Sequence, residues 1–383
     1  MIRNLFLLAG LVVILCPLTA CHHPSADNVQ DDDAAKTIRI EERELHHFQK
    51  LHDLYASIRL IPLETNDSCL MADPRKIIAA NNRFYILSAH AVFLFNADGT
   101  FLRRIHHRGR GPHEYIELDD FAVTENGNIE IAGGNKIMKY TAEDSLLLEQ
   151  NLPQYVDCIA MLSENLTVCH NSTYYPLYLW NANKKKVVNL LQKDEKKAIL
   201  GHLPLVQYHD IIYYQAPYSS DILQVTSDGT KKGWHIDFDK RNITNLVQTV
   251  IGQYSVYAPE PHMADINLFL ETDNYVYIDF SVSELGDYPL KLFYSKESRK
   301  NRVHNDNLLF KDGFSFPSPT AISEDNCFME ILSPIYIFKR LEDWGKTLTD
   351  PEDRALLESM KAQMANVKPE DHPVICVYTL QDF

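Results

Sequence analysis

The sequence lacks the short motifs by which the common catalytic and metal sites are recognised. It contains no Gly-x-Ser-x-Gly nucleophile turn and no His-Glu-x-x-His zinc-binding helix. No two cysteines are spaced as Cys-x-x-Cys, so a structural zinc site is not expected. The sequence therefore assigns no catalytic residue and no metal ligand.

Positive charge is also scarce. The 37 lysines and arginines are outnumbered by 52 aspartates and glutamates, which gives a formal net charge of −15. An acidic surface repels the phosphates of nucleic acids and the headgroups of anionic lipids. We therefore expect no nucleic-acid partner.

Five cysteines follow residue 21, and an odd number of cysteines cannot all be paired in disulfides. Cys158 and Cys169 flank a predicted hairpin turn at residues 163–165. A two-residue turn would place them opposite each other, where a disulfide could form, whereas a slip of one residue would leave buried free thiols. The cysteines concerned are Cys69, Cys158, Cys169, Cys327 and Cys376.

The first 21 residues have the layout of a secretory signal. Arg3 precedes an apolar run over residues 5–15, which is too short for a membrane-spanning helix. The sequence Leu18-Thr19-Ala20-Cys21 then resembles the lipobox of bacterial lipoproteins. The resemblance implies a signal peptide over residues 1–20, cleavage before Cys21, and a lipid on Cys21 that holds the protein on a membrane.

The residues after Cys21 are polar and include three consecutive aspartates at 31–33. This composition is typical of a flexible segment with too few apolar residues for a packed core. We therefore predict a flexible tether over residues 21–50 and a folded domain over residues 51–383.

A short phrase recurs through the folded domain. Each copy is a four-residue apolar or alternating run that closes on an aromatic residue or valine and meets a polar turn. The closing residues lie 45, 40, 45 and 69 positions apart, and a period near 40–45 is typical of a four-stranded β-propeller blade. The copies close at Phe95, Tyr140, Trp180, Val225 and Tyr294.

A second recurring piece, a polar turn followed by a strand, sets the number of blades. Asn, Asp and Gly favour such turns because they tolerate positive φ angles or bond to their own backbone. No long amphipathic helix repeats with the strands. Six copies predict an all-β, six-bladed β-propeller of four-stranded antiparallel blades, with turns at residues 81–83, 125–127, 163–165, 208–210, 272–274 and 324–326.

Two segments interrupt the repeat. A short helical insert is expected in blade five between Lys240 and Asn267, because apolar residues have helical spacing there. A C-terminal helix is predicted to begin at Asp350-Pro351, an aspartate cap followed by proline, and to end near Ala365. The apolar residues of the insert are Ile243, Leu246, Val247, Val250 and Ile251.

The ring can close in two ways. In the first, residues 374–380 form the third strand of blade six, and residues 58–63 from the N-terminal end supply its outer strand. In the second, residues 335–338 form the third strand and residues 374–380 the outer one. We favour the first closure, because it pairs residues 58–63 and removes an open sheet edge.

One specific motif lies between the first two blades: Gly109-Arg110-Gly111-Pro112-His113-Glu114-Tyr115. It is no phosphate-binding loop, because no Gly-Lys-Ser or Gly-Lys-Thr follows it. Together with the preceding hairpin sequence ADGTFLRRI, it resembles the six-bladed β-propeller lipoproteins of the Bacteroidetes, which are NHL-like and often domains of unknown function. That family more usually has Gly at His113 and Asn-Pro at His372-Pro373. The resemblance transfers no catalytic residue, and we interpret Gly109, Gly111, Pro112, Glu114 and Tyr115 as a structural motif.

The function that these features favour is binding. Propellers gather loops at the ends of a central channel, and loops on a rigid scaffold are where recognition usually takes place. Tyrosine side chains combine an apolar face with a polar tip, which suits a glycan, a peptide or an envelope protein as partner. The candidate ligand-binding residues are Tyr174, Tyr175, Tyr218, Tyr254 and Tyr257.

The alternative is a metal-dependent hydrolase or lyase with its site in the central channel. Propeller enzymes of that kind often hold calcium among carboxylates. Acidic residues such as Glu114, Asp119, Asp120 and Asp157 near the blade starts are more typical of solvated loops. The sequence thus predicts a lipid-anchored binding or assembly module of a bacterial cell envelope, attached to the outer membrane on its periplasmic or external face.

Overall fold

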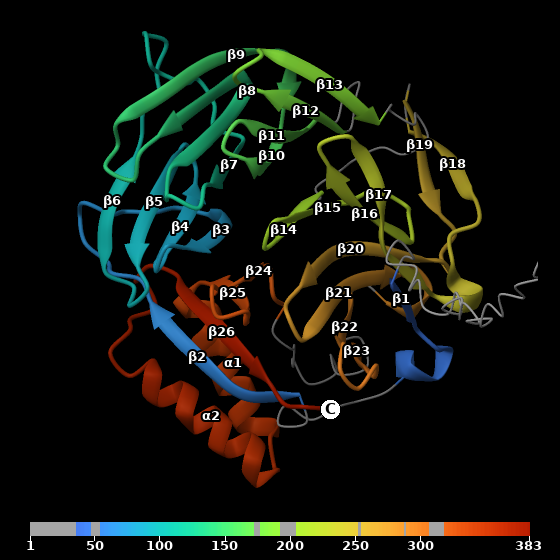
Figure 1. The fold of residues 1–383 in the computed structure, drawn as a ribbon. Coiled ribbons are helices and arrows are strands. Elements are labelled where there is room, and N and C mark those ends of the chain that lie inside the picture. The colour runs from blue at the N-terminus through green and yellow to red at the C-terminus, as the bar shows by residue number, and fades with distance from the viewer. Residues whose placement is uncertain are drawn as a thin grey trace, which may run out of the picture. The chain divides into compact units, whose positions relative to one another are not determined.

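Six small antiparallel sheets are arranged as the blades of a propeller ring (Figure 1). The computed structural model describes residues 36–46, 54–171, 177–191, 204–251, 254–286, 289–305 and 318–383, without the side chains of 250, 251 and 254–256. All of them belong to one compact unit, Ala35–Phe383. The six-bladed propeller prediction is confirmed.

The first three blades follow one another along the chain. Blade two contains three strands by hydrogen bonding, because the long strand β8 bends at Gly133-Gly134 and pairs with β7 before the bend and with β9 after it. Blade one is β3 (Pro74–Ala80), β4 (Arg83–Ser88), β5 (Ala91–Asn96) and β6 (Phe101–Ile105); blade two is β7 (Asp120–Val123), β8 (Ile129–Tyr140) and β9 (Leu146–Val156); blade three is β10 (Cys158–Ser163), β11 (Leu166–His170), β12 (Leu177–Asn181) and β13 (Lys186–Leu191).

The other three blades complete the ring. Blade four carries a fifth strand, β1 (Lys36–Arg39), which pairs in parallel with β17. Blade four is otherwise β14 (Leu205–Tyr208), β15 (Ile211–Gln215), β16 (Asp221–Thr226) and β17 (Gly229–Asp237); blade five is β20 (Ala264–Glu271), β21 (Tyr275–Val282), β22 (Leu290–Ser295) and β23 (Asn301–Asn305); blade six is β24 (Ala321–Ile322), β25 (Phe328–Leu332), β26 (Val374–Leu380) and β2 (Tyr55–Pro62).

The two ends of the folded chain close the ring within blade six. Strand β26 pairs with β25 on one side and with the N-terminal β2 on the other, and Ile61 lies opposite Ile375. The favoured closure is therefore confirmed. The alternative is wrong, because residues 335–338 lie in a helix.

Apolar side chains fill the spaces between neighbouring blades. Successive residues of a strand point to opposite faces, so Ile86 packs towards blade six beside Met329, whereas Leu87 packs towards blade two beside Phe121. A strand buried on both faces needs an unbroken apolar run, which explains why the recurring phrases are so apolar.

The predicted polar turns lie between the first and second strands of each blade. In blade one, Ala80 pairs with Arg83, so Asn81 and Asn82 form a two-residue turn. Both have a φ of 56°. Asparagine tolerates this left-handed conformation, which matches the twist of the flanking strands.

The insert between blades four and five is a β-hairpin, and the prediction of a helix there is wrong. Strand β18 (Leu246–Ile251) pairs antiparallel with β19 (Tyr254–Pro259). The segment 247–251 is rich in β-branched residues, which lose side-chain freedom in a helix and favour a strand. A one-turn 3₁₀ helix, η3 (Asp239–Arg241), precedes the hairpin, and another, η4 (Ser283–Leu285), follows β21 in blade five.

Two helices lie between β25 and β26. Helix α2 (Pro351–Gln363) is the predicted one, and the Asp350 side chain caps it by accepting from the Glu352 N–H. Helix α1 (Pro334–Thr347) was not predicted, although Ser333-Pro334 supplies the same cap-and-proline start. No helix among the described residues is long and apolar enough to span a membrane.

Cys158 and Cys169 are free and buried. A register shift between Met161 and Ser163 places Cys158 opposite His170 and Cys169 opposite Ile159. The two thiols therefore point to opposite faces of blade three, as the slipped-register alternative required.

Residues 36–46, which we call the N-terminal strap, fold against blades four and five. The strap consists of β1 and η1 (Glu42–His46), and Ile38, Ile40 and Leu45 are buried in the core shared with blades four to six. The prediction of a flexible tether over residues 21–50 is therefore wrong for residues 36–46. Their three buried apolar side chains supply the burial that a tether lacks.

Polar contacts fix the strap as well. Arg241 of η3 binds both carboxylate oxygens of Glu42 at 2.7 Å and also contacts Glu284. The side-chain amides of Asn301 and Asn305 in β23 donate to the backbone carbonyls of Arg39 and Leu45 at 2.8 and 3.0 Å. The strap thus joins the outer edges of two neighbouring blades.

The strap should contribute to the stability of the propeller. Ile38→Ala is expected to lower the free energy of unfolding by about 2–5 kcal/mol, because Ile38 is 1% exposed and its removal leaves a cavity. Urea denaturation measures the change. The neighbouring exposed Thr37→Ala is the control and should alter the value by less than about 0.5 kcal/mol. Equal effects of the two substitutions would show that the strap is not packed.

Candidate functional site

A cavity of about 490 Å³ lies at the centre of the ring. Its lining comes from the first strand of every blade and from the turns that follow four of them. Such a cavity on a rigid scaffold is the default binding site of a protein whose sequence carries no other site. The lining strands and turns are found at residues 76–81, 122–125, 159–160, 205–209, 268–270 and 320–326.

The cavity has an apolar wall and a polar mouth. Small and aliphatic side chains form the wall: Ala79, Ala122, Ala160, Leu268 and Ala321. The mouth is formed by the turns and by the end of β14, and its polar residues are Asn81, Glu125, Gln207, His209 and Glu324. The arrangement can hold a ligand that presents an apolar body to the wall and hydrogen-bonding groups to the mouth.

The lysine in the lining is already paired. Lys76 Nζ binds the Asp120 carboxylate at 2.8 and 2.9 Å and the Phe121 carbonyl oxygen at 2.9 Å. Burial opposes the charged form, but Asp120 holds the pKa of Lys76 above its usual value. Asp120 also accepts from the Ile159 N–H. This ion pair therefore joins the first strands of blades one, two and three.

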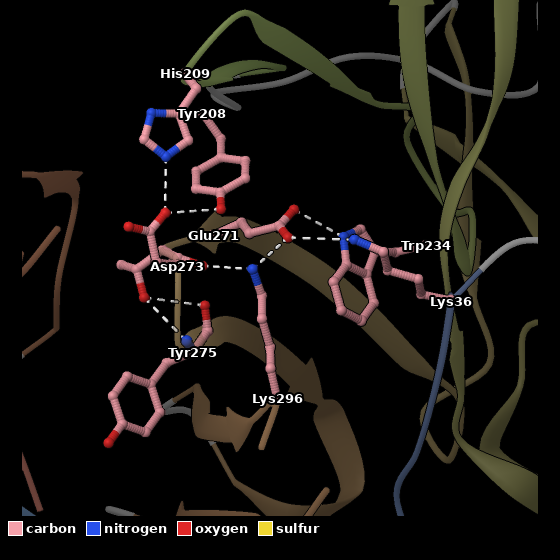
Figure 2. Close-up of polar contacts among 9 residues, drawn as sticks. Lys36, Tyr208, His209, Trp234, Glu271, Asp273, Tyr275 and Lys296 are labelled. Atoms are coloured by element: carbon pink, nitrogen blue, oxygen red, sulfur yellow. Dashed lines mark hydrogen bonds and ion pairs between the residues drawn. The ribbon is translucent and has the colours of Figure 1, made fainter. Parts of the chain in front are cut away.

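A buried carboxylate lies beside the mouth between blades four and five (Figure 2). Glu271 ends β20 and is 0% exposed. Trp234 Nε1 donates to its Oε2 at 2.9 Å, and Lys296 Nζ lies 2.6 Å from its Oε1. Lys36 of the strap approaches the same oxygen at 3.7 Å and lies over the Trp234 ring. Burial lowers the pKa of Lys296, and Glu271 opposes that shift.

The contacts continue from Lys296 to the mouth. The Lys296 ammonium lies 4.8 Å from the centre of the Tyr208 ring, and the Tyr208 hydroxyl donates to Asp273 Oδ1 at 2.9 Å (Figure 2). His209 Nε2 lies 2.7 Å from the same oxygen. Hydrogen bonds from His209 and Tyr208 lower the pKa of Asp273, and burial raises that of Tyr208.

We call these residues the rim cluster: Lys36, Tyr208, His209, Trp234, Glu271, Asp273 and Lys296. Tyr208 and His209 belong to the cavity lining, and Lys36 belongs to the strap. The cluster therefore connects the strap to the mouth through contacts between side chains of two blades.

The structure does not bring the predicted tyrosines together. Tyr174 and Tyr175 lie outside the described residues, and Tyr254 is described only in its backbone, at the start of β19. Tyr257 is half-buried on the hairpin opposite Gln248. Tyr218 follows β15 with a φ of 54° and is half-buried. Neither Tyr218 nor Tyr257 belongs to the lining of the central cavity.

The glycine motif forms a compact turn after β6. The Gly109 N–H donates to the Tyr115 carbonyl, and the Tyr115 N–H donates to the His107 carbonyl, both at 2.9 Å. The Gly111 N–H donates to Glu114 at 2.6 Å. A Cβ on Gly109 would lie 1.9 Å from the Glu114 carboxylate, so a larger residue there would displace the Glu114 side chain.

No three His, Cys, Asp or Glu side chains of the described residues lie close enough together to hold a metal ion. His107 and His113 pair separately with Asp144 at 2.7 Å and with Glu149 at 2.9 Å. Asp119 is hydrogen-bonded by the Gly134 N–H, and burial raises its pKa.

Comparison with known sequences identifies a family. The profile of the family described as domain of unknown function DUF4934 matches residues 35–379. A search of curated protein sequences finds no significant match.

Among the similar solved structures, one supports the fold. A Bacteroides fragilis protein named as exported is 16% identical, with a TM-score of 0.68 over 91% of this chain and 100% of its own. A Bacteroides vulgatus member of the family DUF4221 is 6% identical, with a TM-score of 0.48 over 87% of this chain and 100% of its own. The extracellular domain of a Bacteroides thetaiotaomicron protein named as a one-component system is 13% identical, with a TM-score of 0.39 over 72% of this chain and 32% of its own. At these identities the likeness concerns the fold alone.

Sequence reasoning placed Tyr208, His209 and Asp273 in turns but not in a site. Nothing local indicates that the turns of blades four and five meet, or that Trp234 and Lys36 reach Glu271. The one available signal was Glu271 itself, an acidic residue at the end of an apolar strand.

Glu271 should be the main electrostatic anchor of the rim cluster. Glu271→Gln is expected to lower the free energy of unfolding by about 3 kcal/mol, because Lys296 loses the carboxylate that compensates its burial. Chemical denaturation measures the loss. Asp273→Asn is the matched control; its carboxylate is half exposed, so the change should stay below about 1 kcal/mol. A larger effect of the control would contradict this ranking.

Proposed function

The chain belongs to the DUF4934 family, and from this premise we propose that it is a binding module that works outside the cytoplasm and takes its ligand at the mouth of the central cavity. The single observation that carries the proposal is the cavity itself, with its apolar wall and its mouth of hydrogen-bonding turn residues. Turns on a closed ring of sheets hold such groups in fixed positions at little entropic cost on binding.

The mouth supplies contacts of three kinds. Asn81 and Gln207 offer amide donors and acceptors, and Glu125 and Glu324 offer carboxylates. His209 is held by Asp273 in one orientation. A glycan, or a peptide with an apolar side chain, can pack on the apolar wall and hydrogen-bond to the polar groups of the mouth. We therefore propose glycans and peptides as the ligand classes.

The sequence before the strap supports a place in the cell envelope. We propose that residues 1–20 are a signal peptide, that Cys21 is lipidated, and that residues 21–35 tether the propeller to the outer membrane. The propeller is NHL-like in this proposal. The exported Bacteroides fragilis protein of the same fold supports an extracytoplasmic location.

Thermal unfolding tests the binding site. The protein is heated with a panel of neutral glycans and peptides, and with calcium or EDTA, which test the metal-dependent hydrolase. A ligand present at 100 times its Kd stabilises the native state by about 2.7 kcal/mol and raises the Tm measurably. Gln207→Trp should abolish the shift by filling the mouth, because Gln207 is exposed and lines the cavity.

Asn183→Trp is the control, since Asn183 is exposed in an outer turn of blade three, outside the cavity lining. It should leave the shift unchanged. A shift that survives Gln207→Trp would place the ligand elsewhere, and a shift with calcium alone would favour the hydrolase.

A further inference from the structure

A basic segment interrupts the acidic chain. Residues 101–113 contain four arginines and three histidines but no acidic residue, in a protein of formal charge −15. The segment runs from β6 into the glycine motif. All four arginines are exposed: Arg103, Arg104, Arg108 and Arg110.

Among the described residues, these guanidinium groups have no acidic partner. Within the described part of the chain, none of the four forms an ion pair with a carboxylate, and Arg108 Nε donates only to the Ile116 carbonyl oxygen at 3.3 Å. Arg241, in contrast, binds Glu42 at 2.7 Å. An arginine that serves stability is paired in this way, so the unpaired arginines are available to a ligand.

The carboxylates around the basic segment are mostly engaged. Asp144 binds His107 at 2.7 Å, and Glu149 binds both Lys136 at 2.7 Å and His113 at 2.9 Å. Glu114 accepts from the Gly111 N–H. Glu117 is the other carboxylate that faces the pocket described next. Glu114 and Glu117 both line this pocket, and the four arginines of the segment outnumber these two carboxylates.

The arginines also affect a neighbouring histidine. Partial burial lowers the pKa of His106, and Arg104, His107, His90 and Arg108 lower it further. Nearby cations disfavour a further positive charge, so the segment carries a positive local potential despite the acidity of the whole chain.

A pocket of about 620 Å³ adjoins the arginines. Four of its twelve lining residues are glycines, and Gly134, with a φ of 59°, has nothing within 4 Å of an added Cβ. Arg110, Asn135 and Asn151 also line the pocket, and Arg108 Nε donates to the carbonyl oxygen of the lining residue Ile116. This pocket shares no lining residue with the central cavity.

We propose that this second pocket binds an acidic saccharide. Its carboxylate or sulfate groups pair with Arg108 and Arg110, whose planar guanidinium groups match such oxyanions. Its hydroxyl groups hydrogen-bond to the amides of Asn135 and Asn151, and its ring rests on the glycine backbone. A small saccharide interacts mainly with the local positive charge of the arginines. A flat anionic membrane interacts with the whole protein, whose net charge of −15 repels it.

Calorimetric titration of the purified full-length protein tests the proposal. The probes are a tetragalacturonate, a sulfated heparin tetrasaccharide and, as the neutral match, maltotetraose. At least one acidic probe should bind about tenfold more tightly than the neutral one, and raising NaCl from about 50 to about 300 mM should weaken it several-fold by screening. Equal binding of neutral and acidic probes overturns the proposal.

Paired variants locate the site. The double variant Arg108→Gln with Arg110→Gln should bind the acidic probe about tenfold more weakly, since two exposed charge pairs are lost. Lys184→Gln with Lys185→Gln removes the same charge from an exposed turn of blade three and should change nothing. If the first double variant does not fold, Arg110→Gln alone replaces it. Equal losses in both double variants would indicate net charge rather than a site.

Two further probes separate the alternative anionic partners. Oligoglutamate of matched charge and phosphatidylglycerol vesicles should each bind more weakly than the acidic saccharide. Tighter binding of either probe, lost with Arg108→Gln and Arg110→Gln, would assign the arginines to an acidic peptide or a membrane surface and overturn the saccharide.

Discussion

The pairing of β2 with β26 is the constraint on which the rest of the structure depends. It joins residues more than three hundred positions apart in one sheet and closes the ring, so that six first strands surround one central cavity. It also fixes the path of the chain before it. The N-terminal strap, which precedes β2 in the sequence, packs against blades four and five.

The N-terminal strap contributes a residue to the rim cluster of the candidate site. Lys36 stands at its first described position and contacts Glu271, which is linked through Lys296 and Tyr208 to the mouth. Burying a carboxylate is costly unless charges and hydrogen-bond donors surround it. The partners of Glu271 come from β1, β17 and the turn after β22, so the site is complete only when strap, blade four and blade five have assembled.

Much of the fold could be predicted from the sequence because its signals are local. An apolar run and an adjacent Asn, Asp or Gly turn identify a strand pair without knowledge of its partners. The ring closure through residues 58–63 could then be chosen because it leaves no open sheet edge. The hairpin at 246–259 could not be distinguished from a helix, since Ile243, Leu246 and Val250 satisfy a helical period. The rim cluster could not be predicted from the sequence, because its residue pairs, such as Trp234 with Glu271, depend on contacts between blades.

The two pockets bind ligands through different forces, so binding at each should depend differently on the salt concentration. Binding to the apolar wall of the central cavity is driven by surface removed from water and responds weakly to salt. Binding beside Arg108 and Arg110 is driven by exposed charge and weakens as salt screens it. The dependence of binding on ionic strength therefore helps to assign an acidic or a neutral ligand to one of the two pockets before a variant is made.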